Sequence, residues 1–159
     1  MLVALLQGCG TATPYQPLAE GYGFGQQQLE TNRYRVYFSG NSLTPRETVE
    51  NYLLYRAAEL TLNNGKDYFV IADQGTEVNT VYRSHFDTFG GYGAYRWHPS
   101  SFGALGLGTG TSMPVTRYEA VANILIFSGQ KPQTDPKAFD AREIKTRLEP
   151  TVVRPSEKA

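Results

Sequence analysis

The chain has 159 residues, one cysteine, and 15 acidic against 15 basic residues. This length predicts one domain, and the balanced charge argues against the basic footprint of a nucleic-acid-binding protein. One cysteine leaves no pair for an intramolecular disulfide and too few ligands for a cysteine-based zinc site.

The first nine residues hold the most informative motif. The apolar run Met1 to Leu5 is followed directly by Leu6-Gln7-Gly8-Cys9. This pattern resembles the lipobox of bacterial lipoproteins, in which the bond before the cysteine is cut and the thiol carries diacylglycerol. The resemblance implies a signal peptide remnant at residues 1–8, cleavage between Gly8 and Cys9, and a covalent acyl lipid on Cys9 as the membrane anchor.

The same resemblance implies a location in the bacterial cell envelope. In Gram-negative cells, Gly10 in place of an aspartate favours the outer membrane, with the domain facing the periplasm. No Lys or Arg precedes Cys9, although a secretory signal normally begins with basic residues. Two other interpretations therefore stay open: residues 2–6 begin a buried strand, or the chain is a soluble stress-associated domain with a different start.

Residues 9–32 are predicted to be a lipidated tether. Prolines, glycines and the run Gln26 to Gln28 dominate this stretch, with few aliphatic side chains to bury. Order is expected to begin at Arg33, because residues 33–39 alternate between apolar and polar side chains as a half-buried strand does.

The segment Thr44-Pro45-Arg46-Glu47 predicts the start of a helix. Thr44 and Glu47 have the spacing of a capping box, and proline is favoured at the first helical position. The helix is expected over residues 45–63, with Asn64-Gly65 ending it.

The remaining pattern predicts an α+β fold. Strands are expected near residues 67–73, 76–85 and 116–128, in a small mixed or antiparallel sheet packed against the one main helix. A helical or irregular segment at 138–148 would cover an edge. The domain would span residues 33–149, with a tail at 150–159.

A glycine- and aromatic-rich insert interrupts the domain at residues 86–114. A loop this long is uncommon in a compact domain and is usually functional or disordered. We expect its aromatic side chains to contact an envelope protein or a glycan; the candidates are Tyr92, Tyr95, Trp97 and Phe102.

The sequence contains no recognisable catalytic or metal-binding constellation. His85 and His98 lack a nucleophile elbow or a ligand cluster, so we interpret both as surface or packing residues. Strand-end aspartates are usually turn caps, and arginines on one sheet face usually form cross-strand pairs, here with Glu77 or Glu119. The aspartates concerned are Asp67, Asp73 and Asp87, and the arginines are Arg33, Arg35, Arg56 and Arg83.

Several segments resemble a family of small proteobacterial lipoproteins of unknown function, first named from Caulobacter genes. The helix start at residues 44–59 is the most specific part, and further matching segments are residues 32–36, 40–43, 68–70, 118–120, 131–132 and 139–143. The resemblance implies a single lipid-anchored domain and no particular activity.

We therefore expect a membrane-anchored, non-enzymatic interaction or scaffold protein without a cofactor other than its lipid. The alternative is a periplasmic enzyme with an Asp/Arg site at the sheet edge.

Overall fold

The computed structural model describes residues 10–83 and 113–156. These residues form an α+β fold, as predicted, with one antiparallel five-stranded sheet in the order β1-β2-β4-β3-β5. The strands are β1 (Gly23–Glu30), β2 (Arg33–Ser39), β3 (Tyr68–Arg83), β4 (Met113–Phe127) and β5 (Ala138–Asp140). The helices are α1 (Arg46–Asn63), α2 (Ala141–Leu148) and a 3-10 turn at Glu149–Thr151.

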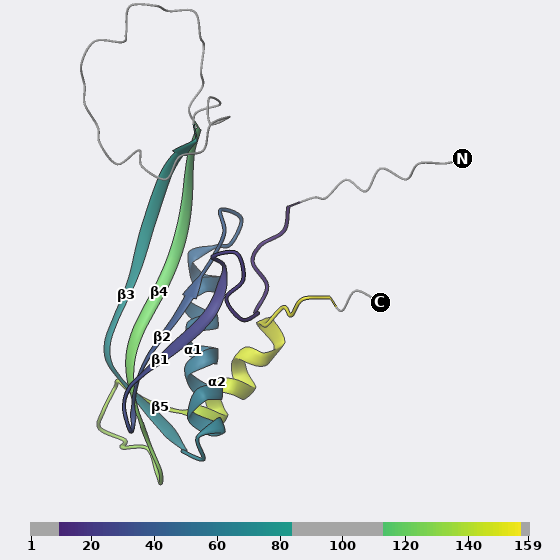
Figure 1. Cartoon of the computed structure of the whole chain (residues 1–159). Helices are drawn as coiled ribbons and strands as arrows, with labels where there is room; N and C mark the ends of the chain where they lie inside the picture. The colour runs from purple at the N-terminus through teal and green to yellow at the C-terminus, as the bar shows by residue number, and fades with distance from the viewer. Residues whose placement is uncertain (1–9, 84–112, 157–159) are drawn as a thin grey trace, which may run out of the picture. The chain divides into compact units, whose positions relative to one another are not determined.

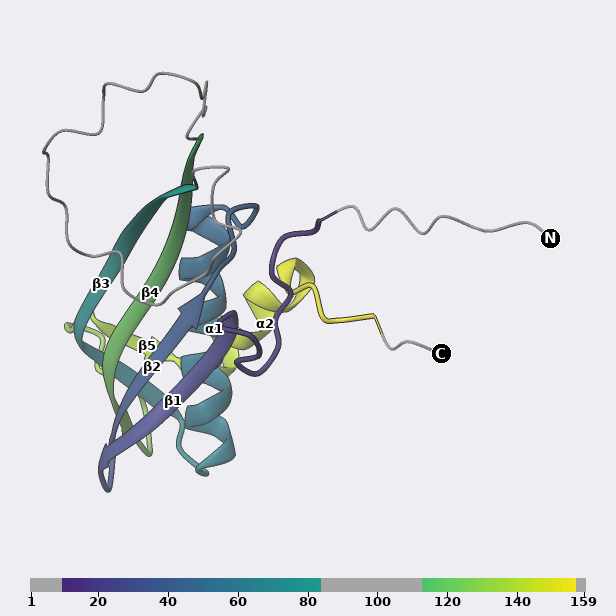
Figure 2. The ribbon, with the colours of Figure 1, turned by 45° about the horizontal axis from the view of Figure 1, so that its top comes forward.

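Helix α1 covers one face of the sheet, and α2 packs beside it (Figures 1 and 2). Val49, Leu53, Ala57 and Leu60 recur at helical spacing in the sequence, which predicts one apolar stripe, and all four are buried in α1. They pack against the helix-facing side of the sheet, to which β2 contributes Val36 and Phe38. The helix ends at Asn63 and Gly65 takes the left-handed conformation with φ +67°, as Asn64-Gly65 predicted.

The order of the strands makes β2, α1 and β3 a crossover unit. Strand β4 lies between β2 and β3, and both run antiparallel to it. Strands β2 and β3 are therefore parallel to each other, with one strand inserted between them. The helix connects them because parallel strands require a long crossover.

The prediction of a tether through residue 32 is wrong from Thr13 onward, since Thr13 and Tyr15 are already buried. Residues 23–30 form β1, which pairs with β2 from Gly23 opposite Ser39 to Glu30 opposite Arg33. A Cβ at Gly23 would lie 2.5 Å from the carbonyl oxygen of Gln16, and Gly23 has φ +120°. Gly23 has no side chain and therefore permits this close packing of the backbone. In the sequence, a glycine with this role looks the same as a glycine of a linker.

The two strands predicted at 67–73 and 76–85 are one strand, β3. Ile71 is buried in the core, and Thr76 donates to Glu50 of α1 at 2.8 Å. Ile71 and Thr76 are five positions apart, so regular alternation would place their side chains on opposite faces of the sheet. Because both face the same helix, the alternation shifts by one residue between them. This interruption lies at or near Gln74-Gly75, the dipeptide that separated the two predicted strands.

Two further predictions need correction. Thr44 makes no capping contact with α1, whose N-cap is Pro45 without a side-chain hydrogen bond. The segment at 138–148 starts as β5, which pairs with the edge of β3 at Tyr68–Val70, and only then becomes α2. Asp140 caps α2 by accepting from the backbone N–H of Glu143 at 2.9 Å.

By compactness the chain divides into two units. The larger contains residues 1–79 and 117–159, and the smaller contains residues 80–116. The described part of the smaller unit consists of the end of β3 and the beginning of β4.

Candidate functional site

The residues predicted to act in anchoring or partner contact lie outside the described residues. These are Gly8 and Cys9 of the lipobox and the aromatic candidates Tyr92, Tyr95, Trp97 and Phe102. His85 and His98, interpreted as surface or packing residues, and Asp87, interpreted as a turn cap, lie outside them too. The structure does describe the segment that follows Cys9 and the strands that flank the insert.

The segment after Cys9 is bonded to the turn between β2 and α1. The backbone N–H of Thr13 donates to Thr44 Oγ1 at 2.8 Å, and Thr13 Oγ1 accepts from the backbone N–H of Asn41 at 2.9 Å. The Asn41 amide donates to the Thr11 carbonyl at 2.7 Å. Gly10, Thr11 and Ala12 are exposed and Thr13 is buried. The chain thus enters the body four residues after Cys9.

Tyr15 continues this attachment into the core. It is 3% exposed, and its ring packs edge-on against Tyr52 and Tyr55 of α1, with centroids 5.5 and 5.0 Å away. Its hydroxyl donates to Glu59. Burial, and then this hydrogen bond to a carboxylate, raises the pKa of the Tyr15 hydroxyl far above its ordinary value.

A network of charged and phenolic groups surrounds Tyr15. Arg56 pairs with Glu59 at 3.0 Å and lies over the ring of Phe24, 4.2 Å from its centroid. Arg154, after α2, donates to the Tyr55 hydroxyl at 3.0 Å. Tyr55 in turn donates to Glu149. Burial, and then this hydrogen bond, raises the pKa of Tyr55, and the same bond lowers the pKa of Glu149.

This network was not predictable from the sequence. Its members come from the segment before β1, from α1, and from the region after α2, so their spacing carries no signal. Tyr55 falls outside the apolar stripe assigned to α1, although it is fully buried. The one available hint was the tyrosine content, 11 residues in the chain, because tyrosine combines a large buried ring with a hydroxyl that requires a partner.

On the open face of the sheet, a shallow hollow of about 300 Å³ brings together two of the predicted residues. It is lined by Arg35 of β2, Asp73 of β3 and Asn123 of β4, together with Gln74, Gly75 and Val121. Arg35 and Asn123 are cross-strand partners, and Arg35 Nε donates to Asn123 Oδ1 at 3.3 Å. The hollow therefore offers a cation, an anion and an amide side by side.

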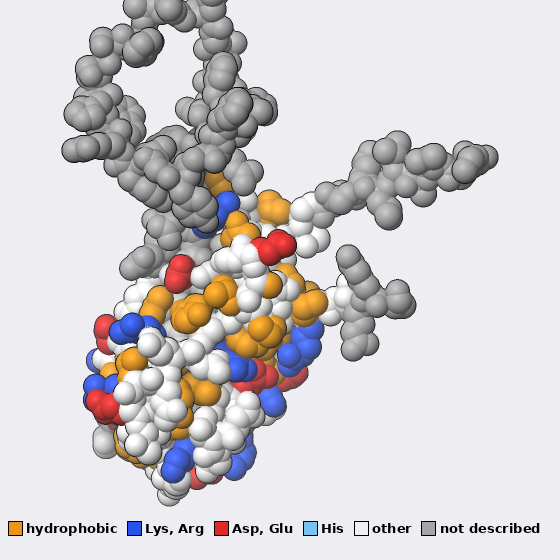
Figure 3. Space-filling view, in the orientation of Figure 1, with side chains coloured by type: hydrophobic (Ala, Val, Ile, Leu, Met, Phe, Trp, Pro, Cys, Tyr) orange, Lys and Arg blue, Asp and Glu red, His pale blue; other side chains and the backbone are white. Residues whose placement is uncertain are grey.

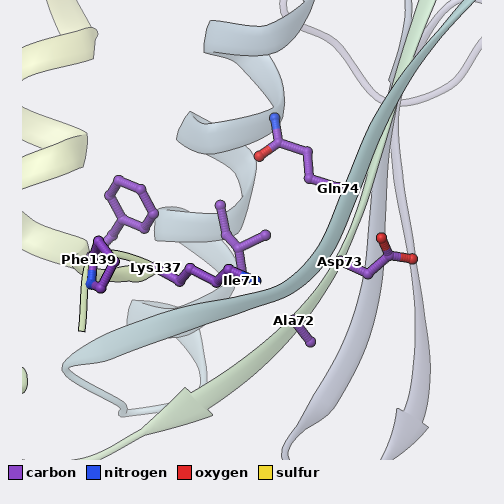
Figure 4. Close-up of a pocket in the computed structure, with 7 residues that line it drawn as sticks. Ile71, Ala72, Asp73, Gln74, Lys137 and Phe139 are labelled. Carbon is purple, nitrogen blue, oxygen red and sulfur yellow. The ribbon is translucent and has the colours of Figure 1, made fainter.

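The interruption in the alternation of β3 sets the direction of Asp73. In Figure 4, Ala72 and Asp73 extend to one side of the β3 ribbon, whereas Ile71 and Gln74 extend towards the helices. A second hollow of about 350 Å³ lies at this point on the outer edge of β3, lined also by Pro136, Lys137 and Phe139. Asp73 lines both hollows.

The other predicted aspartate and arginines have structural partners. Asp67 caps a turn, as expected, by accepting from the backbone N–H of Gly129 at 2.7 Å. Arg33 pairs with Glu30 at 3.7 Å, and Arg56 belongs to α1 on the opposite side of the sheet from Arg35. Arg33, Arg35 and Arg56 are thus not gathered at one site. The side chains of Arg83 and of Glu77, one of the two predicted partners of the arginines, lie outside the described set.

Charge on the visible surface is mixed. Figure 3 shows basic and acidic side chains close to one another across the face in view, with hydrophobic side chains between them. Within residues 10–83 and 113–156, no group of three or more potential metal ligands is found. None of the helices in these two ranges is long and apolar enough to cross a bilayer.

Comparison with known proteins leaves the function to be argued from the chain itself. No protein family, no curated protein and no solved structure matches this chain significantly.

Proposed function

We propose that the protein is a lipid-anchored bacterial envelope protein that acts by interaction rather than by catalysis. Acyl chains on Cys9 would hold it at the outer membrane, with the α+β body facing the periplasm. The observation that supports this best is the exposure of Gly10, Thr11 and Ala12, which places the residue after Cys9 at the surface of the body. A cysteine next to that exposed segment would be accessible to an acylating enzyme.

The body has the properties of a rigid scaffold. The segment after the proposed anchor is held by Thr13 and Tyr15, and the segment after α2 is held by Val153 and Arg154. Two acyl chains are enough for stable anchoring, at about 0.8 kcal/mol for each buried methylene. A transmembrane helix is therefore not required for a stable position at the membrane.

The insert between β3 and β4 is the proposed contact for a partner. Loops carried on a rigid scaffold commonly hold binding residues. Strands β3 and β4 are neighbours in the sheet, so a short hairpin loop could join them. Removal of residues 87–112, which contain Tyr92, Tyr95, Trp97 and Phe102, should leave the sheet intact.

Metabolic labelling with palmitate tests the anchor. We expect label on the wild-type protein and none on Cys9→Ala or Cys9→Ser, with both variants released from the membrane fraction. Wild-type protein that is unlabelled and recovered as a soluble protein would contradict the proposal.

Crosslinking in intact cells tests the partner contact. The wild-type protein is compared with a deletion of residues 87–112 and with a control in which the same residues are replaced by a Gly/Ser segment of equal length. We expect a specific crosslinked envelope partner only for the wild type, with equal thermal stability in all three proteins. A partner retained by both variants would contradict the role of the insert.

The hollow on the open sheet face favours a second function, an enzyme that uses Arg35 and Asp73. A ligand with a carboxylate and an amine, such as an amino acid, could place its carboxylate at Arg35 and its amine at Asp73. Thermal shift measurements with amino acids and dipeptides test this alternative. It requires a shift in the wild type that is lost in Asp73→Asn and in Arg35→Gln.

A further inference from the structure

Leu43 is an exposed leucine at the tip of the turn between β2 and α1. Its side chain is 54% exposed. The turn closes through a bond from the backbone N–H of Thr44 to the Asn41 carbonyl at 3.1 Å, with Ser42 and Leu43 at its central positions. Asn41 Oδ1 also accepts from the backbone N–H of Leu43 at 3.0 Å and from Thr44 Oγ1 at 2.8 Å. These bonds fix the turn that presents Leu43 outwards.

This leucine lies against the residue that follows Cys9. A Cβ placed on Gly10 would come within 3.2 Å of Leu43 Cδ1, so the backbone of residue 10 contacts the leucine side chain. Consecutive Cα atoms are about 3.8 Å apart. The Cα of Cys9 is therefore separated from this contact by a single peptide unit.

The chain after Cys9 also has little freedom to hold the body away from a lipid. The Asn41 amide holds the Thr11 carbonyl at 2.7 Å, and Thr13 is held by Thr44 at 2.8 Å. Between Cys9 and Thr11 there are only two Cα steps, about 7 Å when fully extended. That length is comparable with the depth of about 5–10 Å at which interfacial apolar residues reside in a bilayer.

We infer that the turn Gly40–Thr44 is a membrane-contacting surface and that Leu43 inserts into the lipid beside the acyl chains of Cys9. This inference rests on the proposed lipid anchor and adds the orientation of the body to it. The turn suits a lipid interface because residues 40–45 carry no charge. The nearest charge in the sequence after the turn is Arg46, which pairs with Glu50 at 2.9 Å. Insertion of Leu43 therefore does not remove a charge from water.

The register of β1 and β2 supplies a matched control position. Gly23 pairs with Ser39 at the end of β2 that leads into the turn, and Glu30 pairs with Arg33 at the opposite end. Leu29 is next to Glu30 and is 39% exposed. Leu29 lies six residue steps along the strand from Gly23, about 20 Å at the usual rise per residue. An exposed leucine is thus available far from the proposed lipid contact.

The test places a tryptophan at each position in the full chain, with Trp97→Phe as the common background. Because Cys9 is the only cysteine, its thiol can be coupled to a maleimide phospholipid in phosphatidylcholine vesicles. Half of the vesicle preparations carry brominated acyl chains, which quench tryptophan within the hydrocarbon. Coupling through the thiol makes this measurement independent of whether cells acylate Cys9.

We expect brominated vesicles to lower the emission of Leu43→Trp by about twofold, with a blue shift, as for an interfacial apolar side chain. The emission of Leu29→Trp should remain as in unbrominated vesicles. Equal emission of Leu43→Trp in both vesicle types would overturn the orientation, and so would equal quenching at both positions. Failure of palmitate labelling in cells would instead refute the anchor itself.

Discussion

The backbone N–H of Tyr15 donates to the carbonyl of Val153 at 2.7 Å, which joins the segment before β1 to the segment after α2. The N–H of Val153 donates in turn to the hydroxyl of Tyr52 in α1 at 3.0 Å. Both segments are therefore held against the same helix, and Arg154 lies over the rings of Tyr15 and Tyr55. Tyr15 belongs to the core, whereas Val153 is 65% exposed and is attached to α1 through its backbone. Loss of either segment would remove contacts with α1 and should affect folding.

Tyr15→Ala tests whether this segment belongs to the core or to a tether. Removal of a buried aromatic side chain costs about 3–5 kcal/mol of the free energy of unfolding. The matched control is Leu18→Ala, three residues further along and 47% exposed, for which we expect a change within about 0.5 kcal/mol. Urea denaturation measures both. Equally small effects would restore the interpretation of residues 10–20 as a tether.

Substitutions at Thr44 and Glu47 test whether α1 begins with a capping box or whether Thr44 instead holds the segment that contains Thr13. Thr44 is 2% exposed and accepts from the backbone N–H of Thr13. Thr44→Val keeps the shape of the side chain and leaves that buried donor without its partner, at a cost of about 1–3 kcal/mol. Glu47 is exposed and α1 has no side-chain cap, so Glu47→Gln should change the free energy of unfolding by less than about 0.5 kcal/mol. A capping box would instead make both variants destabilising.

The fold class was predictable because it depends on local periodicity. The stripe Val49, Leu53, Ala57 and Leu60 and the alternation of residues 33–39 each report which face of an element is buried. The helix end at Asn64-Gly65 was predictable for the same reason, since a left-handed glycine is a local requirement.

Features that depend on distant partners were not predictable. Thr44 has the spacing of a helix cap, yet its hydroxyl is used by Asn41 and Thr13. Gly23 has the composition of a linker, yet it allows β1 to approach Gln16 and Pro17. The hollow near Asp73 lies where the alternation of β3 is interrupted, beside Gln74-Gly75, which in the sequence indicated a break between two strands.

Alkaline titration tests the network around Tyr15 and Tyr55. Burial, with hydrogen bonds to Glu59 and Glu149, raises the pKa of both hydroxyls above the ordinary value of 10.0. A raised pKa in the folded state gives stability that is fully present below the unfolded pKa and is lost as pH rises towards the folded pKa. We therefore expect the free energy of unfolding to fall above about pH 10.

The measurement is tyrosinate absorbance against pH, followed together with circular dichroism. Of the 11 tyrosines, Tyr15 and Tyr55 should ionise only when the protein unfolds. In Tyr15→Phe and Tyr55→Phe, the absorbance step that coincides with unfolding should lose one tyrosine. Complete ionisation of all tyrosines before unfolding would show that these hydroxyls are accessible to solvent.

Asp67 should make the protein sensitive to acid. It lies between α1 and β3, where its carboxylate accepts from the backbone N–H of Gly129 at 2.7 Å and from Arg142 at 3.0 Å. The bond from Gly129, followed by the bond from Arg142, lowers the pKa of Asp67 below its ordinary value of 3.8. A lowered pKa gives stability that is present above the unfolded pKa and is lost as pH falls through the folded one.

Asp67→Asn should therefore destabilise the protein at neutral pH. The variant should also lose less stability than the wild type as the pH falls below about 4. Glu20→Gln is the control, because Glu20 is an exposed residue of the turn before β1, and its stability profile should follow that of the wild type. Urea denaturation at a series of pH values gives both profiles. An Asp67→Asn profile parallel to that of the wild type would show that Gly129 and Arg142 do not favour the ionised carboxylate. The turn at Asp67 would then be held by its backbone bonds to Phe127 and Ala141, at 2.8 and 3.0 Å, and not by the charge of its side chain.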